Sequence, residues 1–523
     1  MQGEEVQEDV QELGISTAKR GALYLFGKFS SSIVVLVLLI FLARYLQPAP
    51  YGLYSIAVAF SSLLGIGGAF GIGTAFRKML PEMKKDGHEK INDVISSGYL
   101  FASLMGLVIG IVGYLASGYI AVAAYGNPAL TLPLQLASIS VFIGVLFNLA
   151  LAVLVGLYMV KEAAISNIVY SLVNLFASVG LVLLGYGVAG AVAGMVLGLL
   201  AGALIGMVYM ALRKGHRFTM PKRNVLKGLT KFSTPVVASH VATLGAQNFA
   251  VLFLGLFATA SIVGNYGAAF KLARFIELSI TSITFVLLPA FSVALSEKNS
   301  AHRIGSIYNK SLYYTALLLF PLVAYMAATA IPWMHLLVSS QYTFAPQYFA
   351  FIVVGMALGL IGAYAGTLII GEGDTKRFMK YQLIAVVVQV ALLLALTPEF
   401  LALGVLIALF AVTPIVLDVI YMKALEEQYK FKHELKAFLI IAAVSVILGL
   451  VMYYASMLLN QGRLAIIADA VLAILAFPPL LALTKSIKKE NLEFLGRVGS
   501  KMKPAKPIID LGVRYTAFFM RGN

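Results

Sequence analysis

The 523-residue chain contains no cysteine, a single tryptophan and few charged residues. Without cysteine it has no disulfide, no thiolate nucleophile and no cysteine-based metal site. Charged residues make up only 12% of the chain, whereas 60% of the residues are hydrophobic. This balance indicates a membrane protein rather than the three or four soluble domains that such a length would otherwise predict.

Sequence motifs for nucleotide or metal chemistry are also missing. No phosphate-binding loop with its lysine occurs, so ATP-driven transport by this chain alone is not expected. The glycine-rich run from Gly65 to Gly71 lies inside an apolar segment with no preceding strand, which excludes a dinucleotide loop. We therefore expect no catalytic residue, no metal, no cofactor and no enzymatic activity.

Long apolar runs recur along the whole chain. A bilayer core of about 30 Å needs about 20 helical residues, and lipid cannot hydrogen-bond exposed backbone groups, so such runs must be helices. The sequence predicts an all-α polytopic membrane protein of about fourteen transmembrane helices. The predicted spans are residues 21–46, 50–76, 93–122, 130–159, 164–186, 188–212, 233–257, 262–294, 310–337, 346–370, 380–397, 401–425, 436–459 and 463–484.

The 39 Lys and Arg residues are divided unevenly between the two sides of these spans. Only Arg44 and Arg463 fall on one side, three more cations lie within spans, and all the others lie on the opposite side. Cytoplasmic loops carry the excess of Lys and Arg, so we expect a multi-pass protein of the cell (cytoplasmic) membrane with both termini in the cytoplasm. This distribution explains the net charge of +16 without a nucleic-acid partner.

A weak internal repeat relates the two halves of the chain. The first and seventh spans begin with similar text, at Lys28–Val34 and Lys231–Val237. Further on, Gly52-Leu53-Tyr54 matches Gly264-Asn265-Tyr266. Six spans per repeat is an even number, so both halves share one orientation and form a parallel pseudo-twofold repeat about the membrane normal. Chance similarity between apolar segments is the alternative.

The repeat predicts two six-helix lobes plus two additional C-terminal helices. The C-terminal tail, which is rich in Lys and Arg, is either a helix lying on the anionic inner leaflet or a solvated chain. The predicted parts are an N-terminal cytoplasmic tail (1–20), the first lobe (21–212), a basic cytoplasmic linker (213–232), the second lobe (233–425), two additional helices (426–484) and a basic cytoplasmic tail (485–523).

Glycine recurs at every fourth position of the sixth span, which places these glycines on one face of the helix. A face of this kind allows close helix approach, and we favour this packing interpretation over a seam that slides during transport. The glycines are Gly190, Gly194, Gly198, Gly202 and Gly206.

The eighth span carries three charged residues, Lys271, Arg274 and Glu277. Spacing of three places them on neighbouring parts of one helix face, and Lys271 lies about 14 Å from the end of the span. Each such cation costs about 3 kcal/mol even on lenient insertion scales. Two cations and one acid leave an unbalanced positive charge that an anionic cargo could neutralise. The alternative is a structural Arg274–Glu277 pair with Lys271 reaching toward the interface.

Other polar residues within spans are weaker candidates. Lys28 and Arg44 could also bind the cargo, although Lys28 is near enough to the end of its span to reach the cytoplasm. Gln247 and Asn248 are deep in the seventh span and could line a cavity or bridge helices.

Three further ionisable residues in spans have ordinary interpretations. His240 could relay protons, but a packing role is favoured. Asp418 and Asp469 are nearer the ends of their spans, and we expect them at the membrane interface.

Several short segments resemble a known family. Arg44 and its neighbours Ala43–Leu46, then Tyr51–Ala57 and Arg77–Glu82, are similar to the polysaccharide-transporter (Wzx-type oligosaccharide flippase) family. This family belongs to the multidrug/oligosaccharidyl-lipid/polysaccharide exporter superfamily. In the second half, Val263–Tyr266 and Phe270–Ala273 resemble the counterpart repeat.

The resemblance implies two lobes around a central cavity and a flippase that moves lipid-linked oligosaccharide by alternating access. The cargo would be a polyprenyl phosphate or pyrophosphate glycan, whose charge suits the cations within spans. Membrane lipids are the other partners, H⁺ or Na⁺ is the candidate coupling ion, and a monomer is expected. Family members commonly have an acidic residue near the middle of the seventh span, where this chain has Gln247-Asn248-Phe249.

Two other functions are alternatives to the flippase. An ion-coupled small-molecule or multidrug exporter of the same superfamily predicts twelve spans and acidic cavity residues. A membrane glycosyltransferase or polymerase would need acidic residues in sizeable loops, but the outer loops are short and contain almost no acid apart from Glu399.

Overall fold

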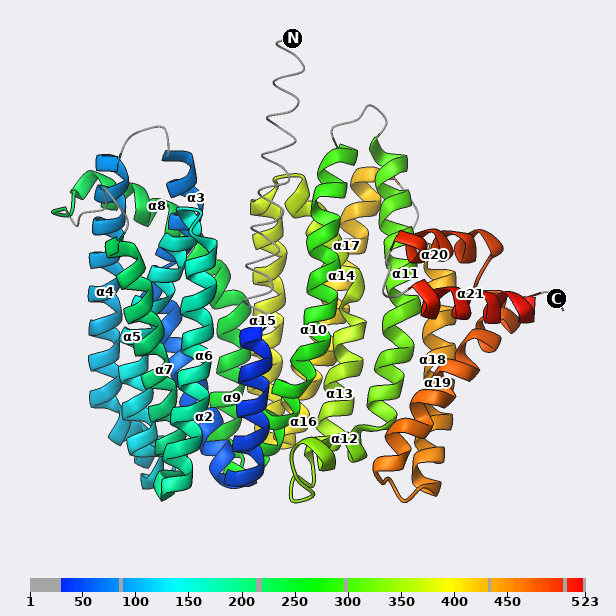
Figure 1. Ribbon diagram of the computed structural model, residues 1–523, viewed down its shortest axis with the longest axis horizontal. Coiled ribbons are helices and arrows are strands. Elements are labelled where there is room, and N and C mark those ends of the chain that lie inside the picture. Colours follow the sequence, from blue (N-terminus) through cyan, green and yellow to red (C-terminus); the bar gives the residue numbers. More distant parts are fainter. Residues whose placement is uncertain are drawn as a thin grey trace, which may run out of the picture. The chain divides into compact units, whose positions relative to one another are not determined.

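The computed structural model describes residues 30–83, 88–212, 219–295, 300–430, 434–501 and 506–520. This described part is helical and contains no strand, as the apolar runs predict. The chain forms two compact units, Met1–Gly267 and Ala268–Asn523 (Figure 1).

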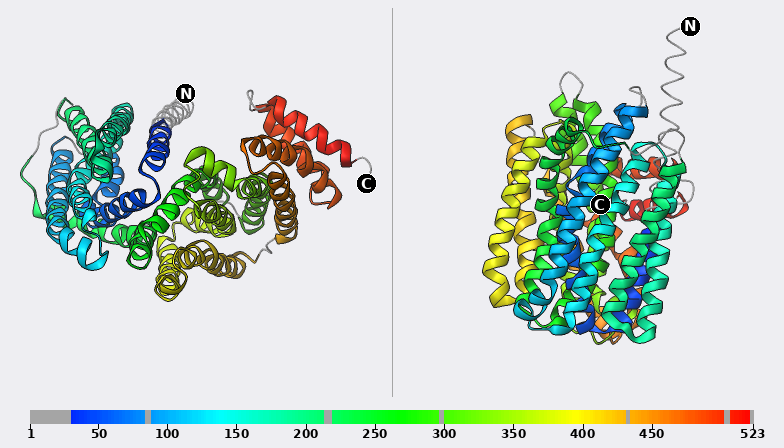
Figure 2. Two further views of the ribbon diagram at one scale, coloured as in Figure 1. Left: turned by 90° about the horizontal axis from the view of Figure 1, so that it is seen from below. Right: turned by 90° about the vertical axis from the view of Figure 1, so that its left-hand side faces the viewer.

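Within the first unit, neighbouring helices pack lengthwise. Figure 1 and both views of Figure 2 show α4 to α7 running side by side, and α5 lies against both α4 and α7. The helices are Ser30–Leu46, α2 (Pro48–Ala69), α3 (Ile72–Glu82), α4 (His88–Tyr119), α5 (Thr131–Gly156), α6 (Val160–Leu181), α7 (Gly187–Leu212), α8 (Arg223–His240), α9 (Ala246–Phe257) and the start of α10 (Ala260–Leu295).

The second unit ends in two helices that run across, rather than along, the direction of α18 and α19 (Figure 1, red). One of them, α21, packs on α19, where the Tyr515 hydroxyl donates to the Leu475 carbonyl at 3.1 Å. The helices after α10 are α11 (Ser300–Ala328), α12 (Ala330–Leu337), α13 (Ala345–Leu358), α14 (Leu360–Gly371), α15 (Thr375–Phe400), α16 (Ala402–Leu406), α17 (Thr413–Tyr429), α18 (Leu435–Leu458), α19 (Arg463–Leu483), α20 (Lys489–Lys501) and α21 (Lys506–Met520).

Many of the predicted membrane crossings are present as long apolar helices. In the described residues, nine helical runs are long and apolar enough to cross a membrane, and the bent pair α13 and α14 makes a tenth.

One run, Val160–Leu212, has 53 residues, about 80 Å of helix, which is far more than a bilayer core. It reverses at Gly185 and Gly187, whose φ angles of 92° and 51° favour glycine. The count of fourteen stays a prediction.

The glycine face of α7 packs against α6, which confirms the packing interpretation. A Cβ on Gly194 would lie 2.3 Å from the Ser178 backbone nitrogen, and one on Gly198 would lie 2.8 Å from the Tyr170 carbonyl oxygen. Hydrogen in place of a side chain therefore lets the two backbones approach. The Ser178 hydroxyl uses this proximity to donate to the Ala191 carbonyl at 3.1 Å.

Substitution of Gly194 by alanine should destabilise the first unit. The added methyl overlaps backbone atoms of α6, and overpacking of this kind costs about 1–3 kcal/mol. The matched control is Gly180→Ala on α6, because a Cβ there has nothing within 4 Å. Thermal unfolding of the purified variants should show a lower midpoint for Gly194→Ala and an unchanged or raised midpoint for Gly180→Ala.

The matched glycines of the internal repeat contact one another. A Cβ on Gly52 would lie 1.8 Å from the carbonyl oxygen of Ala260, and a Cβ on Gly264 would lie 1.9 Å from that of Pro48. Gly52 thus contacts the residue four positions before Gly264, and Gly264 contacts the residue four positions before Gly52. Reciprocal contacts of this form are the signature of a twofold relation, and they agree with the parallel repeat expected from the sequence.

Two predicted spans are broken rather than continuous. The span 50–76 divides into α2 and α3 at Phe70 and Gly71, with φ angles of 44° and 66°. The span 346–370 divides into α13 and α14, which bend by 43°. Glycine lowers helix propensity by about 1 kcal/mol per residue, and both breaks coincide with glycines.

The basic linker is attached to the start of α4. Lys222 forms a 2.6 Å ion pair with Asp93, and the Thr219 hydroxyl donates to the same carboxylate at 2.9 Å. Backbone N–H groups of Thr219 and Lys222 donate to the hydroxyls of Ser96 and Ser97. The hydrogen bond with Asp93 raises the pKa of the Lys222 ammonium above its ordinary value. These contacts fix the direction in which α8 begins.

Candidate functional site

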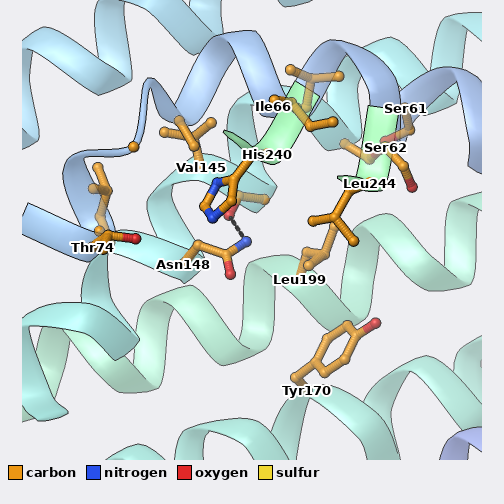
Figure 3. Close-up of a pocket in the computed structure, with 18 of the residues that line it drawn as sticks. Ser61, Ser62, Ile66, Thr74, Val145, Asn148, Tyr170, Leu199, His240 and Leu244 are labelled. Carbon is orange, nitrogen blue, oxygen red and sulfur yellow. Dashed lines mark hydrogen bonds between the residues drawn. The ribbon is translucent and has the colours of Figure 1, made fainter. Parts of the chain in front are cut away.

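A cavity of about 430 Å³ lies inside the first unit (Figure 3). Helices α2, α3, α5, α6, α7 and α8 all contribute to its wall, together with Leu244 after α8. Figure 3 shows side chains from these separate segments gathered around one space. The polar residues that line it are Ser61, Ser62, Thr74, Arg77, Ser140, Asn148, Tyr170 and His240.

The break between α2 and α3 helps to form this cavity. Because the helix is interrupted at Gly71, α3 begins in a new direction and brings Thr74 and Arg77 to the wall. The positive φ of Gly71 favours glycine, and a Cβ there would lie 3.1 Å from the Ser233 carbonyl oxygen. The glycine-rich run is therefore a local helix break beside the cavity.

Small polar groups of α5 are arranged around the cavity by local hydrogen bonds. The Asn148 amide nitrogen donates to the Gly144 carbonyl at 2.8 Å (Figure 3), so its carbonyl oxygen is not used in that bond. The hydroxyls of Ser61 and Ser140 are 2.5 Å apart and join α2 to α5. A wall of this kind offers hydrogen bonds to a polar guest.

The charge of the cavity wall is of one sign. Arg77 and His240 are its basic residues, and no Asp or Glu is among the described residues that line it. Arginine donors suit phosphate and carboxylate groups, whereas an organic cation would need acidic partners. The arrangement therefore fits a neutral or anionic polar group.

Filling the cavity should stop any transport that uses it. Asn148→Trp places a large side chain in the cavity, whereas Leu204→Trp on α7 adds the same bulk at a residue that is 53% exposed. With both variants inserted and equally stable in detergent, we expect Asn148→Trp to reduce cargo flux more than tenfold and Leu204→Trp to leave it near the wild-type rate. Equal flux in a vesicle assay would contradict a role for the cavity.

The predicted cations Lys271 and Arg274 lie one turn apart on α10, in the second unit. Lys271 is half-buried and Arg274 is exposed. The guanidinium of Arg274 is 5.9 Å from the ring centre of Phe270, which itself packs on Phe410 at 6.0 Å. The side chain of Glu277 lies outside the described part, so the predicted pairing with Arg274 stays a prediction.

Arg44 is not among the residues that line the cavity of the first unit. Arg44 is exposed near the end of the helix Ser30–Leu46. The first residue of the cavity wall, Ser61, lies on α2, about 20 Å along that helix from its start at Pro48. Lys28 lies outside the described residues. Binding of cargo by either cation therefore remains a prediction.

Gln247 and Asn248 are half-buried on α9, immediately after Leu244 and His240 of the cavity wall. The Asn248 amide donates to the Leu244 carbonyl at 2.8 Å, which links it to a residue that lines the cavity. Their predicted lining of a cargo pathway is not tested.

The position of Asp418 and Asp469 at the membrane interface stays a prediction, but the structure shows that both side chains are buried. Their exposed fractions are 8% and 0%, because neighbouring helices cover them although they are not central in their spans. The sequence signal that could have predicted this burial is a carboxylate within an apolar run. Among the described residues, no group of three or more His, Cys, Asp or Glu could hold a metal ion.

Comparison with known proteins gives the family. A model of the polysaccharide biosynthesis protein family matches residues 41–346. The chain belongs to this family. The match confirms the resemblance to the polysaccharide transporters that the short segments indicated. No curated protein matches the sequence.

Solved structures give the fold. The lipid II flippase MurJ, in an inward closed conformation, matches with a TM-score of 0.69 and 18% identity over 88% of this chain and 98% of that one. An inward-facing multidrug resistance MATE family transporter of the MOP superfamily matches with a TM-score of 0.63 and 14% identity over 76% and 94%. A MOP superfamily transporter from Pyrococcus furiosus, described as having a binding pocket of reverse polarity, matches at 0.53 and 16% over 78% and 94%.

These matches confirm the all-α membrane fold class of this polysaccharide biosynthesis protein. They extend over most of the chain, so the family fold is not confined to residues 41–346. Because fold alone does not fix cargo, the choice between a lipid-linked glycan and a small molecule depends on the chemistry of the site.

Proposed function

We propose that the protein is a flippase that moves lipid-linked oligosaccharide, a polyprenyl phosphate or pyrophosphate glycan, across the cytoplasmic membrane by alternating access. In this proposal both termini are cytoplasmic, the monomer is the working unit and no bond in the cargo is made or broken. Membership of the polysaccharide biosynthesis family supports the glycan as cargo.

The observation that carries the proposal is the sign of the charges inside the spans. Lys271 and Arg274 lie within α10, and the described wall of the cavity in the first unit includes Arg77 and His240 but no carboxylate. Cations in lipid surroundings are costly, and their retention is explained by a cargo that is anionic. A phosphate or pyrophosphate supplies such a charge in a form that Lys and Arg donors bind well.

A small-molecule exporter is the second candidate, because multidrug MATE transporters share the fold. Export of organic cations would require acidic residues facing the cargo, and the described cavity wall has none. The exporter would therefore have to accept neutral or anionic molecules. For the MOP superfamily transporter from Pyrococcus furiosus, the reverse polarity of the binding pocket is described as suggesting a different function.

Removing the charges of α10 should abolish flipping. In Lys271→Ala/Arg274→Ala two charge-assisted interactions with phosphate are lost, each worth about 1.5–3 kcal/mol, which predicts a decrease of a hundredfold or more. The measurement is the flux of a fluorescent polyprenyl-phosphate glycan in proteoliposomes. The charge-retaining variant Lys271→Arg/Arg274→Lys is the control and should keep most of the activity.

Two results would overturn these ideas separately. Normal flipping by the double alanine variant, with its fold intact, would exclude α10 as the phosphate site while leaving a flippase. Transport of an organic cation by the wild type, with no movement of the glycan lipid, would exclude the flippase itself in favour of the exporter.

A further inference from the structure

The second unit contains a buried carboxyl group at a helix break. Asp418 of α17 is 8% exposed, and its Oδ1 accepts a hydrogen bond of 2.7 Å from the backbone nitrogen of Gly362. Gly362 is the third residue of α14, directly after the 43° bend that separates α14 from α13. The break leaves N–H groups of the first turn of α14 without partners in their own helix, and Asp418 takes one of them.

Two opposing effects act on this carboxyl. Burial among packed helices disfavours its charged form because a charge is poorly solvated there. The N–H donor and the positive end of the α14 dipole favour the charged form. No described Lys, Arg or His side chain forms an ion pair with Asp418, so neither form is fixed by a countercharge. A group held between such effects is suited to gain and lose a proton.

The elements packed on α17 bring few other ionisable groups to this position. Nearest in α11 is Tyr308, whose hydroxyl donates to the Ile361 carbonyl at 3.4 Å. The hydroxyl of Tyr364 in α14 is already hydrogen-bonded to Thr315. In α13 the ionisable residue is Tyr348, which stacks on Phe344 at the far end of that helix. The segment between α16 and α17 has none. In α15, Tyr381 packs on Tyr421 of α17, and Arg377 donates to the Ala424 carbonyl of the same helix.

A second buried polar group lies beside Asp418. Tyr421, one turn further along α17, is 1% exposed, and its hydroxyl has no hydrogen-bond partner among the described atoms. Both residues face glycines of α14. A Cβ on Gly362 would lie 2.7 Å from Asp418 Oδ1, and one on Gly366 would lie 3.5 Å from the Tyr421 hydroxyl. The absence of a side chain on each glycine thus allows the acid and the hydroxyl to approach the backbone of α14.

Polar groups continue from Tyr421 to the end of α14. The rings of Tyr421 and Tyr381 meet edge to face at 5.4 Å, and Arg377 Nε donates to the Tyr381 hydroxyl at 3.1 Å.

Arg377 also donates to the Ala424 carbonyl at 3.0 Å and to Gln428. Gln428 and Tyr429 in turn donate to the carboxylate of Glu372. Gly362 and Glu372 are ten residues apart, about 15 Å along the helix.

We propose that Asp418 is a reversible proton-binding site of the second unit, reached by water that moves from the Glu372 end of α14 past Tyr421 and Tyr381, and that H⁺ is the ion coupled to transport. The carboxyl takes up one proton and releases it to water at that end, with no other bond changed. Coupling to cargo rests on the proposed transport function, whereas proton binding does not.

The first test measures the proton site without cargo. Infrared difference spectra of the purified full-length protein between acidic and alkaline pH should contain a protonated carboxyl band that Asp418→Asn removes. Asparagine keeps an oxygen that can accept from Gly362, so the helix contact is retained. Asp469→Asn is the matched control, because it removes another buried carboxyl within a span and should leave the Asp418 band in place. Loss of the same band in both variants, or in neither, contradicts the proposal.

The second test measures coupling. A pH gradient of one unit driving one proton supports up to a tenfold accumulation of cargo in proteoliposomes. We expect accumulation by the wild type and by Asp469→Asn, and none by Asp418→Asn. If Asp418→Asn does not fold, Tyr421→Phe should slow proton exchange several-fold while keeping the carboxyl band. Accumulation driven by a sodium gradient and not by a pH gradient would overturn the assignment of H⁺.

The outcomes separate this inference from the proposed function. A titrating Asp418 in a protein that moves no glycan lipid would leave the proton site and remove the flippase. Glycan flipping that ignores pH gradients, in a protein without the Asp418 band, would leave the flippase and remove the proton site.

Discussion

Hydrocarbon provides no hydrogen bonds and little solvation for charge, and the structure of this chain follows from that constraint. Every apolar run must satisfy its own backbone, so the described residues of the runs form helices. Charges are excluded from the runs unless something compensates them. Among the charged residues that remain within helices, Lys271 and Arg274 on α10 and Asp418 on α17 are therefore informative about function.

Glycine serves two purposes under this constraint. On α7 it lets two helices pack closely, since lipid offers no hydrophobic drive for association and close contact must supply it. At Gly71 and around Gly359 it accompanies helix breaks, and each break lies beside a polar feature. The first borders the cavity of the first unit, and the second supplies the N–H group that meets Asp418.

The two units carry different chemistry. The cavity of the first unit has basic and neutral polar residues in its described wall, which suits the phosphate of a lipid-linked glycan. The second unit has a carboxyl group covered by tyrosines and backbone, with no described ion-pair partner. The second unit also contains Lys271 and Arg274 of α10, so in the proposed transport its cations would bind the cargo and its buried carboxyl group would bind the proton. The proposed alternating access would couple the two by one conformational change to which both sites respond.

The sequence by itself determined the membrane class, the helical fold and the family, because these depend on composition, period and short local motifs. It also located the cations of α10 and the glycine face of α7, since both are visible as spacing within one helix. Only the tertiary structure decided which polar residues meet. Asn148, Tyr170 and His240 come from separate helices to one cavity, and Asp418 is buried and accepts a hydrogen bond from α14 just after its bend. Burial and partnership depend on neighbours distant in the chain, and no local pattern contains that information.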